Sequence, residues 1–309
     1  MSNTPDESRP TRRRTTVADV ARMHADGQRI AMLTAYDHPT AALLDEAGVP
    51  LLLVGDSLGE VVLGYDSTVR VSVTEMLHHV KAVVRGAPHA LVIADMPFLS
   101  YGVSAEESVR NAGVFLSEGG AQAVKVEGGT RSARTIEAIV RSGIAVMGHI
   151  GWTPQARHAL GGKVRVQGKT REQARALLAD ALAVQESGAF AVVLELVPEQ
   201  LAAAITARLD IPTIGIGAGA GCNGQVLVIN DLLGLGEFTP RHARRYAEIG
   251  AVIRDAVTRW VSDVESGAFP SAAETVRMED AVLEEALGRS PLDQPSADEA
   301  APIPLDRDL

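Results

Sequence analysis

The sequence predicts an α/β protein of the (β/α)8 (TIM) barrel class. Three observations lead to this prediction: 309 residues suit one large α/β domain, short apolar runs recur along the chain, and helical patterns separate them. The apolar runs, each a predicted strand, are IAMLTAYD (30–37), LLLVGDS (51–57), ALVIADMP (90–97), AVKVEGG (123–129), AVMGHIGW (145–152), AVVLELVP (191–198), PTIGIGAG (212–219) and QVLVIND (225–231). Because the runs are continuous and not alternating, they are typical of parallel strands buried on both faces.

Amphipathic segments with helical spacing lie between the predicted strands. The clearest are HPTAALLDEAG (38–48), VTEMLHHVKAVVRG (73–86) and REQARALLADALAVQESG (171–188). Strands that alternate with helices indicate βαβ units with right-handed crossovers, and eight such strands favour a closed barrel. One interval argues the other way, since GAGCNG between the last two strands leaves little room for a helix. An open, doubly wound sheet is the structural alternative.

The two ends of the chain differ from its centre. Residues 1–15 contain an arginine run without an apolar stretch behind it and predict a flexible tail. The catalytic barrel is expected over 16–268, where 241–267 has a long helical pattern with an apolar stripe that could close the barrel or contact a second subunit. Residues 269–309 are rich in Pro, Ala and acids and predict an extension that is largely disordered at its end.

Charge and composition narrow the classes of function. The formal net charge of -10 argues against a nucleic-acid partner, because phosphate binding draws on clustered Lys and Arg. No apolar run approaches the roughly 18 residues of a membrane helix, and no signal-like apolar stretch follows the arginines, so we expect a cytoplasmic protein without a membrane partner. The single cysteine, Cys222, excludes an internal disulfide and fits a reducing compartment.

Polar side chains end or follow several of the predicted strands. In barrels of this class the carboxyl ends of the strands and the loops after them form the active site. The candidate residues are Asp56, Ser57, Asp95, Lys125, Glu127, His149 and Glu195. Each of them alone has a structural explanation, as a helix cap, an ion pair or a hydrogen-bonded histidine. Several acids from consecutive strands at one end of a barrel favour the functional interpretation.

The acidic candidates suit a magnesium ion. Carboxylates without His or Cys partners are oxygen ligands that favour Mg2+ over Zn2+. A 2-oxo acid could chelate such an ion through its carboxylate and ketone, and loss of a proton from the neighbouring carbon would give an enolate whose charge the ion stabilises. Glu195 lies among apolar residues in the sequence, so we expect a raised pKa and a role as general base. The residues alone therefore predict enolate chemistry.

Seven motifs in a fixed order resemble those of the ketopantoate hydroxymethyltransferase family. They are MLTAYD, VGDSLG, VVLGYDST, ADMPF, KVEGG, GHIGWTPQ and GQVLV, and the likeness covers about residues 15–265. The resemblance implies a barrel of the phosphoenolpyruvate/pyruvate type that transfers a hydroxymethyl group from 5,10-methylenetetrahydrofolate to 3-methyl-2-oxobutanoate. The product would be 2-dehydropantoate (ketopantoate), made through a Mg-stabilised enolate in pantothenate and coenzyme A biosynthesis. A homodecamer is the implied assembly.

The resemblance also implies how the metal and the oxo acid are bound. By this likeness Asp56 and Asp95 would bind Mg2+, with Glu127 at the metal directly or through water. Contacts to the oxo acid would come from Asp56, Ser57, Asp95 and Lys125.

The remaining roles and the departures from the family pattern follow from the same comparison. Glu195 would accept the proton, His149 would support the site and Tyr36 would line the pocket. Asn223 stands where the family has an acid, Glu60 stands where it has Met, and GGKVRVQG is one residue longer than the family's GGxxVQG. These departures bear on the folate side of the pocket and on the loop after the fifth strand.

Three other functions stay open on the sequence alone. A Mg-dependent lyase of 2-oxo acids in the same barrel superfamily would share the metal and the enolate. Gly219, Gly221 and Gly224 satisfy the GxGxxG pattern of dinucleotide sites, although a strand and not a helix is expected after them. A metal-bound scaffold or ligand-binding module is the non-enzymatic alternative.

Overall fold

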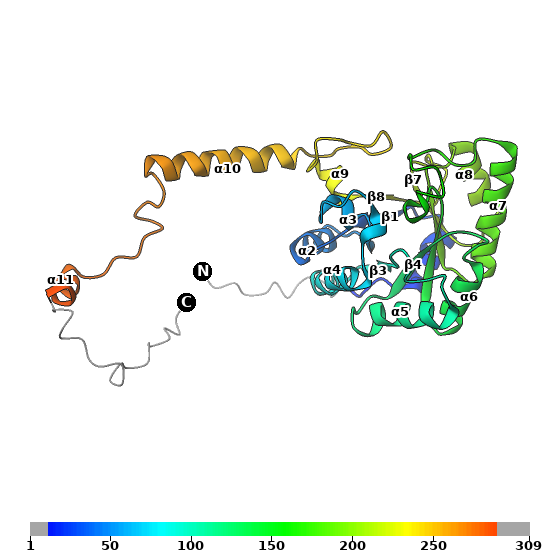
Figure 1. Ribbon diagram of the computed structural model, residues 1–309, viewed down its shortest axis with the longest axis horizontal. Coiled ribbons are helices and arrows are strands. Elements are labelled where there is room, and N and C mark those ends of the chain that lie inside the picture. The colour runs from blue at the N-terminus through cyan, green and yellow to red at the C-terminus, as the bar shows by residue number, and fades with distance from the viewer. Residues whose placement is uncertain (1–11, 289–309) are drawn as a thin grey trace. The chain divides into compact units, whose positions relative to one another are not determined.

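The structure, a computed structural model, describes residues 12–288. The chain divides into two compact units, Met1–Gly250 and Ala251–Leu309. In the first unit eight parallel strands pair in chain order and close into a barrel, because β8 pairs with β1 (Figure 1). The strands are β1 (Ile30–Thr34), β2 (Leu51–Val54), β3 (Leu91–Asp95), β4 (Ala123–Glu127), β5 (Ala145–Gly151), β6 (Ala191–Glu195), β7 (Thr213–Ile216) and β8 (Gly224–Leu227). The predicted (β/α)8 barrel is confirmed, and the open sheet is wrong.

Helix α1 (Val17–Ala25) precedes β1, and further helices follow most of the strands. They are α2 (His38–Glu46), α3 (Leu58–Val61), α4 (Val73–Gly86), α5 (Ala105–Ser117), α6 (Ala133–Arg141), α7 (Arg171–Glu186), α8 (Glu199–Thr206) and α9 (Ile229–Leu233). Reciprocal capping boxes start three of these helices: Thr16 with Asp19 at α1, Ser72 with Glu75 at α4 and Thr170 with Gln173 at α7. Between β7 and β8 the chain forms only a turn, so the glycine pattern there leads into a strand and lacks the helix that a dinucleotide site needs.

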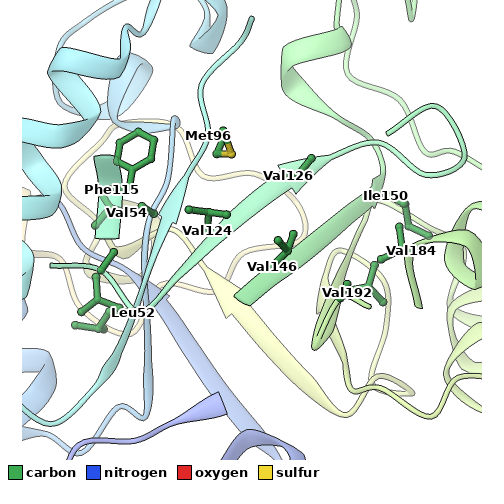
Figure 2. Close-up of a cluster of buried hydrophobic side chains, with 14 of the residues drawn as sticks. Leu52, Val54, Met96, Phe115, Val124, Val126, Val146, Ile150, Val184 and Val192 are labelled. Carbon is green, nitrogen blue, oxygen red and sulfur yellow. The ribbon is translucent and has the colours of Figure 1, made fainter. Parts of the chain in front are cut away.

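The strands separate two apolar layers. The inner layer, which fills the barrel interior, includes Ile30, Met32, Leu51, Leu53, Leu91, Ile93, Ala123, Met147, Ala191 and Val193. The outer layer, which lies between the strands and the helices, includes Leu52, Val54, Phe115, Val124, Val126, Val146, Val184 and Val192 (Figure 2). Because side chains alternate along a strand, a residue two positions beyond an inner-layer residue also faces the interior.

The amino-terminal end of the barrel is closed by α1 and the segment before it. Val20 of α1 is buried with the inner layer. Arg12 donates to the carbonyl of Asp45 (2.6 Å) and Arg14 to that of Pro88 (2.9 Å). The part of the predicted flexible tail that the structure describes, residues 12–15, is therefore attached to the barrel, whereas residues 1–11 lie outside the described residues.

The carboxyl-terminal region differs from the prediction. The helix expected over 241–267 begins later in the structure, as α10 (Ile249–Ser266). The residues before it form a loop in which Arg245 donates to the carbonyls of Gly236 and Glu237. The predicted barrel extends to residue 268, yet the chain divides after Gly250. The side chains of 251–288 are exposed in the single chain, and contact of the apolar stripe with a second subunit stays a prediction.

The described part of the predicted extension over 269–309 contains α11 (Asp280–Gly288). Its end, residues 289–309, lies outside the described residues. Within residues 12–288 the structure contains no helix with the length and apolar character needed to cross a membrane.

Two glycine substitutions test the packing around the barrel. A Cβ at Gly86, where α4 packs against α2, would lie 2.4 Å from the carbonyl oxygen of His38 and 3.0 Å from Ala41 Cβ. We expect Gly86→Ala to lower the free energy of unfolding by about 1–3 kcal/mol through overpacking. Gly113, inside α5, has no atom within 4 Å of an added Cβ, so Gly113→Ala should raise it by about 0.5–1 kcal/mol. Urea titration measures both, and equal effects would contradict the packing argument.

Candidate active site

The candidate residues form a polar layer above the apolar filling of the barrel. Asp95 ends β3 and pairs in register with Lys125 of β4, and Glu127 pairs with His149 of β5. Each is an even number of positions from an inner-layer residue of its own strand, so its side chain enters the interior. Glu195 ends β6 with the same alternation. These five residues, with Asp56 and Ser57 from the turn after β2, line one cavity of about 980 Å³.

A buried lysine joins two of the carboxylates. Lys125 Nζ lies 3.0 Å from Asp95 Oδ2 and 3.7 Å from Glu127 Oε1, and all three side chains are at most 5% exposed. Burial alone would lower the pKa of Lys125, but the negative charges of Asp95, Glu127 and Asp56 outweigh it and raise that pKa. The ammonium group therefore stays charged at the bottom of the cavity.

Asp56 is held beside Asp95 at the same end of the barrel. Its backbone N–H donates to Asp95 Oδ2 (3.1 Å), and its side chain is buried. Burial, followed by the charges of Asp95 and Glu127, raises the pKa of Asp56 well above its usual range. Burial likewise raises the pKa of Asp95, against the opposing charge of Lys125. The carboxylates are thus crowded to a degree that one lysine does not relieve.

His149 connects this cluster to Glu195. Its Nδ1 lies 3.0 Å from Lys125 Nζ and 3.3 Å from Glu127 Oε1, and its Nε2 lies 3.3 Å from Glu195 Oε2. Burial and the charge of Lys125 lower the pKa of His149, but the two glutamates outweigh them and raise it to about 9. With a proton, Nδ1 can donate to Glu127; without one, it accepts from Lys125.

Glu195 differs from its sequence-based description. The apolar neighbours Val193 and Val197 are buried, yet the Glu195 side chain is 18% exposed and borders the cavity. The enclosure by apolar residues that its sequence neighbours suggested is therefore incomplete. What the structure provides is a carboxylate at the cavity wall with an imidazole behind it.

Ser57 and Tyr36 contact each other, but only Ser57 lines the cavity. Ser57 lines the cavity, and its Oγ lies 2.8 Å from Tyr36 Oη. Tyr36 is buried and is not among the lining residues, so it supports Ser57 from behind and does not face the cavity as the resemblance implied.

The residues fit a hard divalent cation. Asp95 Oδ1 is buried and has no hydrogen-bond partner among the described residues. The negative charge of Asp56, beside it, is disfavoured by burial and by the charges of Asp95 and Glu127, which raise its pKa well above the usual range. Within residues 12–288 no three His, Cys, Asp or Glu side chains form a ready set of metal ligands, and Lys125 contacts both Asp95 and Glu127. Two carboxylates suffice for Mg2+, which usually retains water and binds substrate oxygens as well.

Several residues that line the cavity or contact its lining residues have no counterpart in the sequence-based site. The loop after β5 brings Gln155 into contact with Asp56, and Tyr101 from the loop after β3 contacts Gln155. Gln155 lies in the GHIGWTPQ motif, but its role depends on a contact across 99 positions that no local pattern contains. The same loop carries Arg157 to the cavity, where it lies 3.4 Å from Glu60.

The three departures from the family pattern lie in different places. Asn223 precedes β8 and accepts hydrogen bonds from the backbone and hydroxyl of Thr213 at the amino end of β7. It is therefore remote from the carboxyl ends of the strands, and the expected effect on the folate side is wrong for this residue. Glu60 and the lengthened loop do line the cavity, the loop through Val164, Arg165 and Val166.

Comparison with solved structures defines the class of this barrel. Phosphonopyruvate hydrolase, in a complex with oxalate and Mg2+, matches with a TM-score of 0.55 and 12% identity, covering 88% of this chain and 95% of that one. A 2,3-dimethylmalate lyase, described as a member of the PEP mutase/isocitrate lyase superfamily, matches with a TM-score of 0.54 and 15% identity, covering 89% and 99%. At these identities the likeness concerns the fold alone. In fold the chain is a (β/α)8 barrel like these enzymes.

Sequence comparison identifies the family within that class. The model of ketopantoate hydroxymethyltransferase matches residues 14–272. The 3-methyl-2-oxobutanoate hydroxymethyltransferase of Chloroflexus aggregans is 59% identical over 276 residues, which cover 89% of this chain and 98% of that protein. The enzyme of the same name from a Dehalococcoides mccartyi strain is 55% identical over 273 residues, covering 88% and 96%. The chain belongs to the ketopantoate hydroxymethyltransferase family.

Proposed function

We propose that the chain transfers a hydroxymethyl group from 5,10-methylenetetrahydrofolate to 3-methyl-2-oxobutanoate and forms 2-dehydropantoate for pantothenate biosynthesis. Family membership supports the reaction, and the site supports its first step. The observation that carries the proposal is the arrangement of Glu195 and His149 at the wall of the same cavity that contains the crowded carboxylates and Lys125.

Asp56 and Asp95 are the proposed Mg2+ ligands, with Glu127 acting on the ion through water. Their burial and mutual repulsion are relieved by a divalent cation, and Asp95 Oδ1 is available to it. When bound, Mg2+ supplies positive charge against the negative charge that develops on the keto oxygen of the oxo acid. Lys125 and Ser57 contact the oxo acid, the lysine by its charge and the serine by its hydroxyl group.

Glu195 is the proposed acceptor of the proton from C3 of the oxo acid. Its carboxylate reaches the cavity, and His149 Nε2, 3.3 Å from Glu195 Oε2, counters its charge before the proton arrives. A general base in such a position typically contributes about 10² to 10⁴ in rate. The carbon that loses the proton can then attack the one-carbon group that the folate carries.

The outer part of the cavity suits the folate. Exposed apolar side chains there include Val164 and Phe238, and basic side chains include Arg157, Arg165 and Arg241. A pteroylglutamate combines a flat ring system with an anionic tail, so it matches apolar surface next to arginines. We assign this region to the co-substrate.

Arg241→Ala tests this assignment. We expect the KM for 5,10-methylenetetrahydrofolate to rise roughly fivefold, because an exposed ion pair contributes up to about 1 kcal/mol. Deuterium exchange at C3 of the oxo acid, measured without folate, should stay unchanged. Arg244→Ala is the control, since Arg244 lies in the same loop but packs over Tyr246 and does not line the cavity. Equal effects of the two variants would contradict the assignment.

The experiment that tests the proposed function is deuterium exchange from 3-methyl-2-oxobutanoate with Mg2+, followed by product formation with 5,10-methylenetetrahydrofolate. We expect exchange without folate and 2-dehydropantoate only with it. Cleavage of an oxo-diacid without folate would instead support the alternative, a Mg-dependent lyase. For the assembly we propose the homodecamer that the family resemblance implied, with a cytoplasmic location, and sedimentation of the full chain tests the assembly.

A further inference from the structure

We propose that Gln155 is a positioning residue for the carboxylate cluster, with its side-chain amide held in one orientation by Tyr101. This inference rests on the proposed function, because it assigns to Gln155 the task of presenting Asp56 and Glu127 to the cation. It extends that function, since neither Gln155 nor Tyr101 is needed to account for the chemistry of the oxo acid.

Every polar group of Gln155 that faces the cluster is engaged. Nε2 donates to Asp56 Oδ2 (2.9 Å) and to the carbonyl of Met96 (2.9 Å). The backbone N–H donates to Glu127 Oε2 (3.2 Å), and Oε1 accepts from Tyr101 Oη (2.6 Å). Because the residue is 5% exposed, water does not replace these partners. One residue of the loop after β5 therefore binds groups that follow or end β2, β3 and β4.

Tyr101, together with the acceptors Asp56 and Met96, fixes which end of the amide faces Asp56. The Tyr101 Oη accepts the backbone N–H of Glu127 (3.3 Å), and its single proton has two acceptors, Gln155 Oε1 (2.6 Å) and the carbonyl of Glu127 (3.4 Å), of which Gln155 is much the nearer. If the amide were reversed, Oε1 would face the carboxylate of Asp56 and the carbonyl of Met96, which are both acceptors. That arrangement would leave buried acceptors without donors, which is unfavourable for each of them. The amide therefore presents its N–H groups to Asp56.

The consequence is a carboxylate with one oxygen committed and the other available. The hydrogen bond from Gln155 holds Asp56 Oδ2 and stabilises the charged form of a carboxylate that burial disfavours. In the same way the backbone N–H of Gln155 holds Glu127 Oε2. Hydrogen-bond partners of metal-binding side chains typically change metal affinity by about 10–100-fold when they are removed.

Mg2+ binding to the full chain, measured by isothermal titration with Mg2+ alone, tests the inference. We expect Gln155→Leu, which keeps the size but removes the donor, to weaken binding by about 10–100-fold. Gln155→Glu should weaken it at least as much, because it replaces the donor with a further negative charge. Exchange at C3 of the oxo acid should recover in Gln155→Leu when Mg2+ is raised to saturation, as a loss of affinity requires.

Gln122→Leu is the matched control. Gln122 is also bonded at both ends of its amide, to the N–H of Val92 and the carbonyl of Gly120, but it precedes β4 at the opposite end of the barrel. Its substitution should lower the thermal stability and leave Mg2+ affinity unchanged. If Gln155→Leu does not fold, Tyr101→Phe replaces it, because loss of the hydroxyl leaves Gln155 Oε1 without its donor, loosens the side chain and should also weaken Mg2+ binding.

The outcomes separate this inference from the proposed function. If the wild type binds Mg2+ and the Gln155 variants bind it with the same affinity, the positioning role is contradicted and the proposed function is not. The same holds for Tyr101→Phe where that variant replaces them. An equal loss of Mg2+ affinity in Gln122→Leu also contradicts it, since the effect would then be one of general destabilisation. Wild-type protein that binds no Mg2+ and exchanges no deuterium contradicts the proposed function and this inference together.

Discussion

Glu195→Gln is expected to reduce deuterium exchange at C3 of 3-methyl-2-oxobutanoate by about 10² to 10⁴. Glutamine keeps the size and the polar contact with His149, which lies 3.3 Å from Glu195 Oε2, but an amide cannot accept the proton. The affinity for Mg2+ should stay close to that of the wild type, because Glu195 lies across His149 from the carboxylates that hold the ion. The measurement is NMR of the exchanging proton together with titration of Mg2+.

A neighbouring acid provides the control for this prediction. Glu199→Gln changes an exposed acid in the first turn of α8, four residues beyond Glu195, and should leave exchange unaffected. Exchange that persists in Glu195→Gln would assign the base to another group, with His149 the next candidate because it reaches the same cavity. Loss of Mg2+ binding together with exchange would show that Glu195 acts on the cluster and not on the substrate.

The fold could be predicted from the sequence because each strand carries a local signal. Continuous apolar runs such as 51–57 and 191–198 mark strands buried on both faces, and the residues that end them reach the active site by the geometry of parallel strands alone. This is why Asp95, at the end of β3, could be found without knowledge of its contacts. The residue at which each strand ends was less predictable, because the residues that follow a strand continue its sequence pattern into the loop.

The rest of the site could not be predicted because it depends on contacts between distant loops. Gln155 and Tyr101 belong to loops after different strands, and neither residue type signals a role until the fold brings them together. Glu195 shows the opposite error, since apolar neighbours in sequence suggested burial, whereas the strand ends there and the side chain borders the cavity. Local sequence determines which residues reach the carboxyl end of the barrel, and the loops determine what they meet.

Asp95→Asn is expected to abolish measurable Mg2+ binding and, with it, exchange at C3 of the oxo acid. Asp95 contributes a buried oxygen without a partner and a negative charge 3.0 Å from Lys125; the amide removes the charge and replaces one of the two oxygens with an NH2 group, which cannot bind a cation. The loss should exceed the roughly 100-fold that removal of a supporting hydrogen bond produces, because a charged ligand is replaced by a neutral one. In the wild type, EDTA should stop exchange and added Mg2+ should restore it, whereas Asp95→Asn should not respond to either.

Stability has to be separated from metal binding in this experiment, because Asn at position 95 also leaves Lys125 with fewer counter-charges. Asp45→Asn provides that separation. Asp45 is equally buried and accepts from His89 Nδ1 (2.7 Å) and from the backbone N–H of Ala90 (2.7 Å), but it lies at the amino-terminal end of the barrel. Its substitution should destabilise the fold and leave Mg2+ binding intact. If Asp95→Asn binds Mg2+ as well as Asp45→Asn does, the cation is not held at the ends of β2 and β3, and the carboxylate crowding there serves only to hold Lys125.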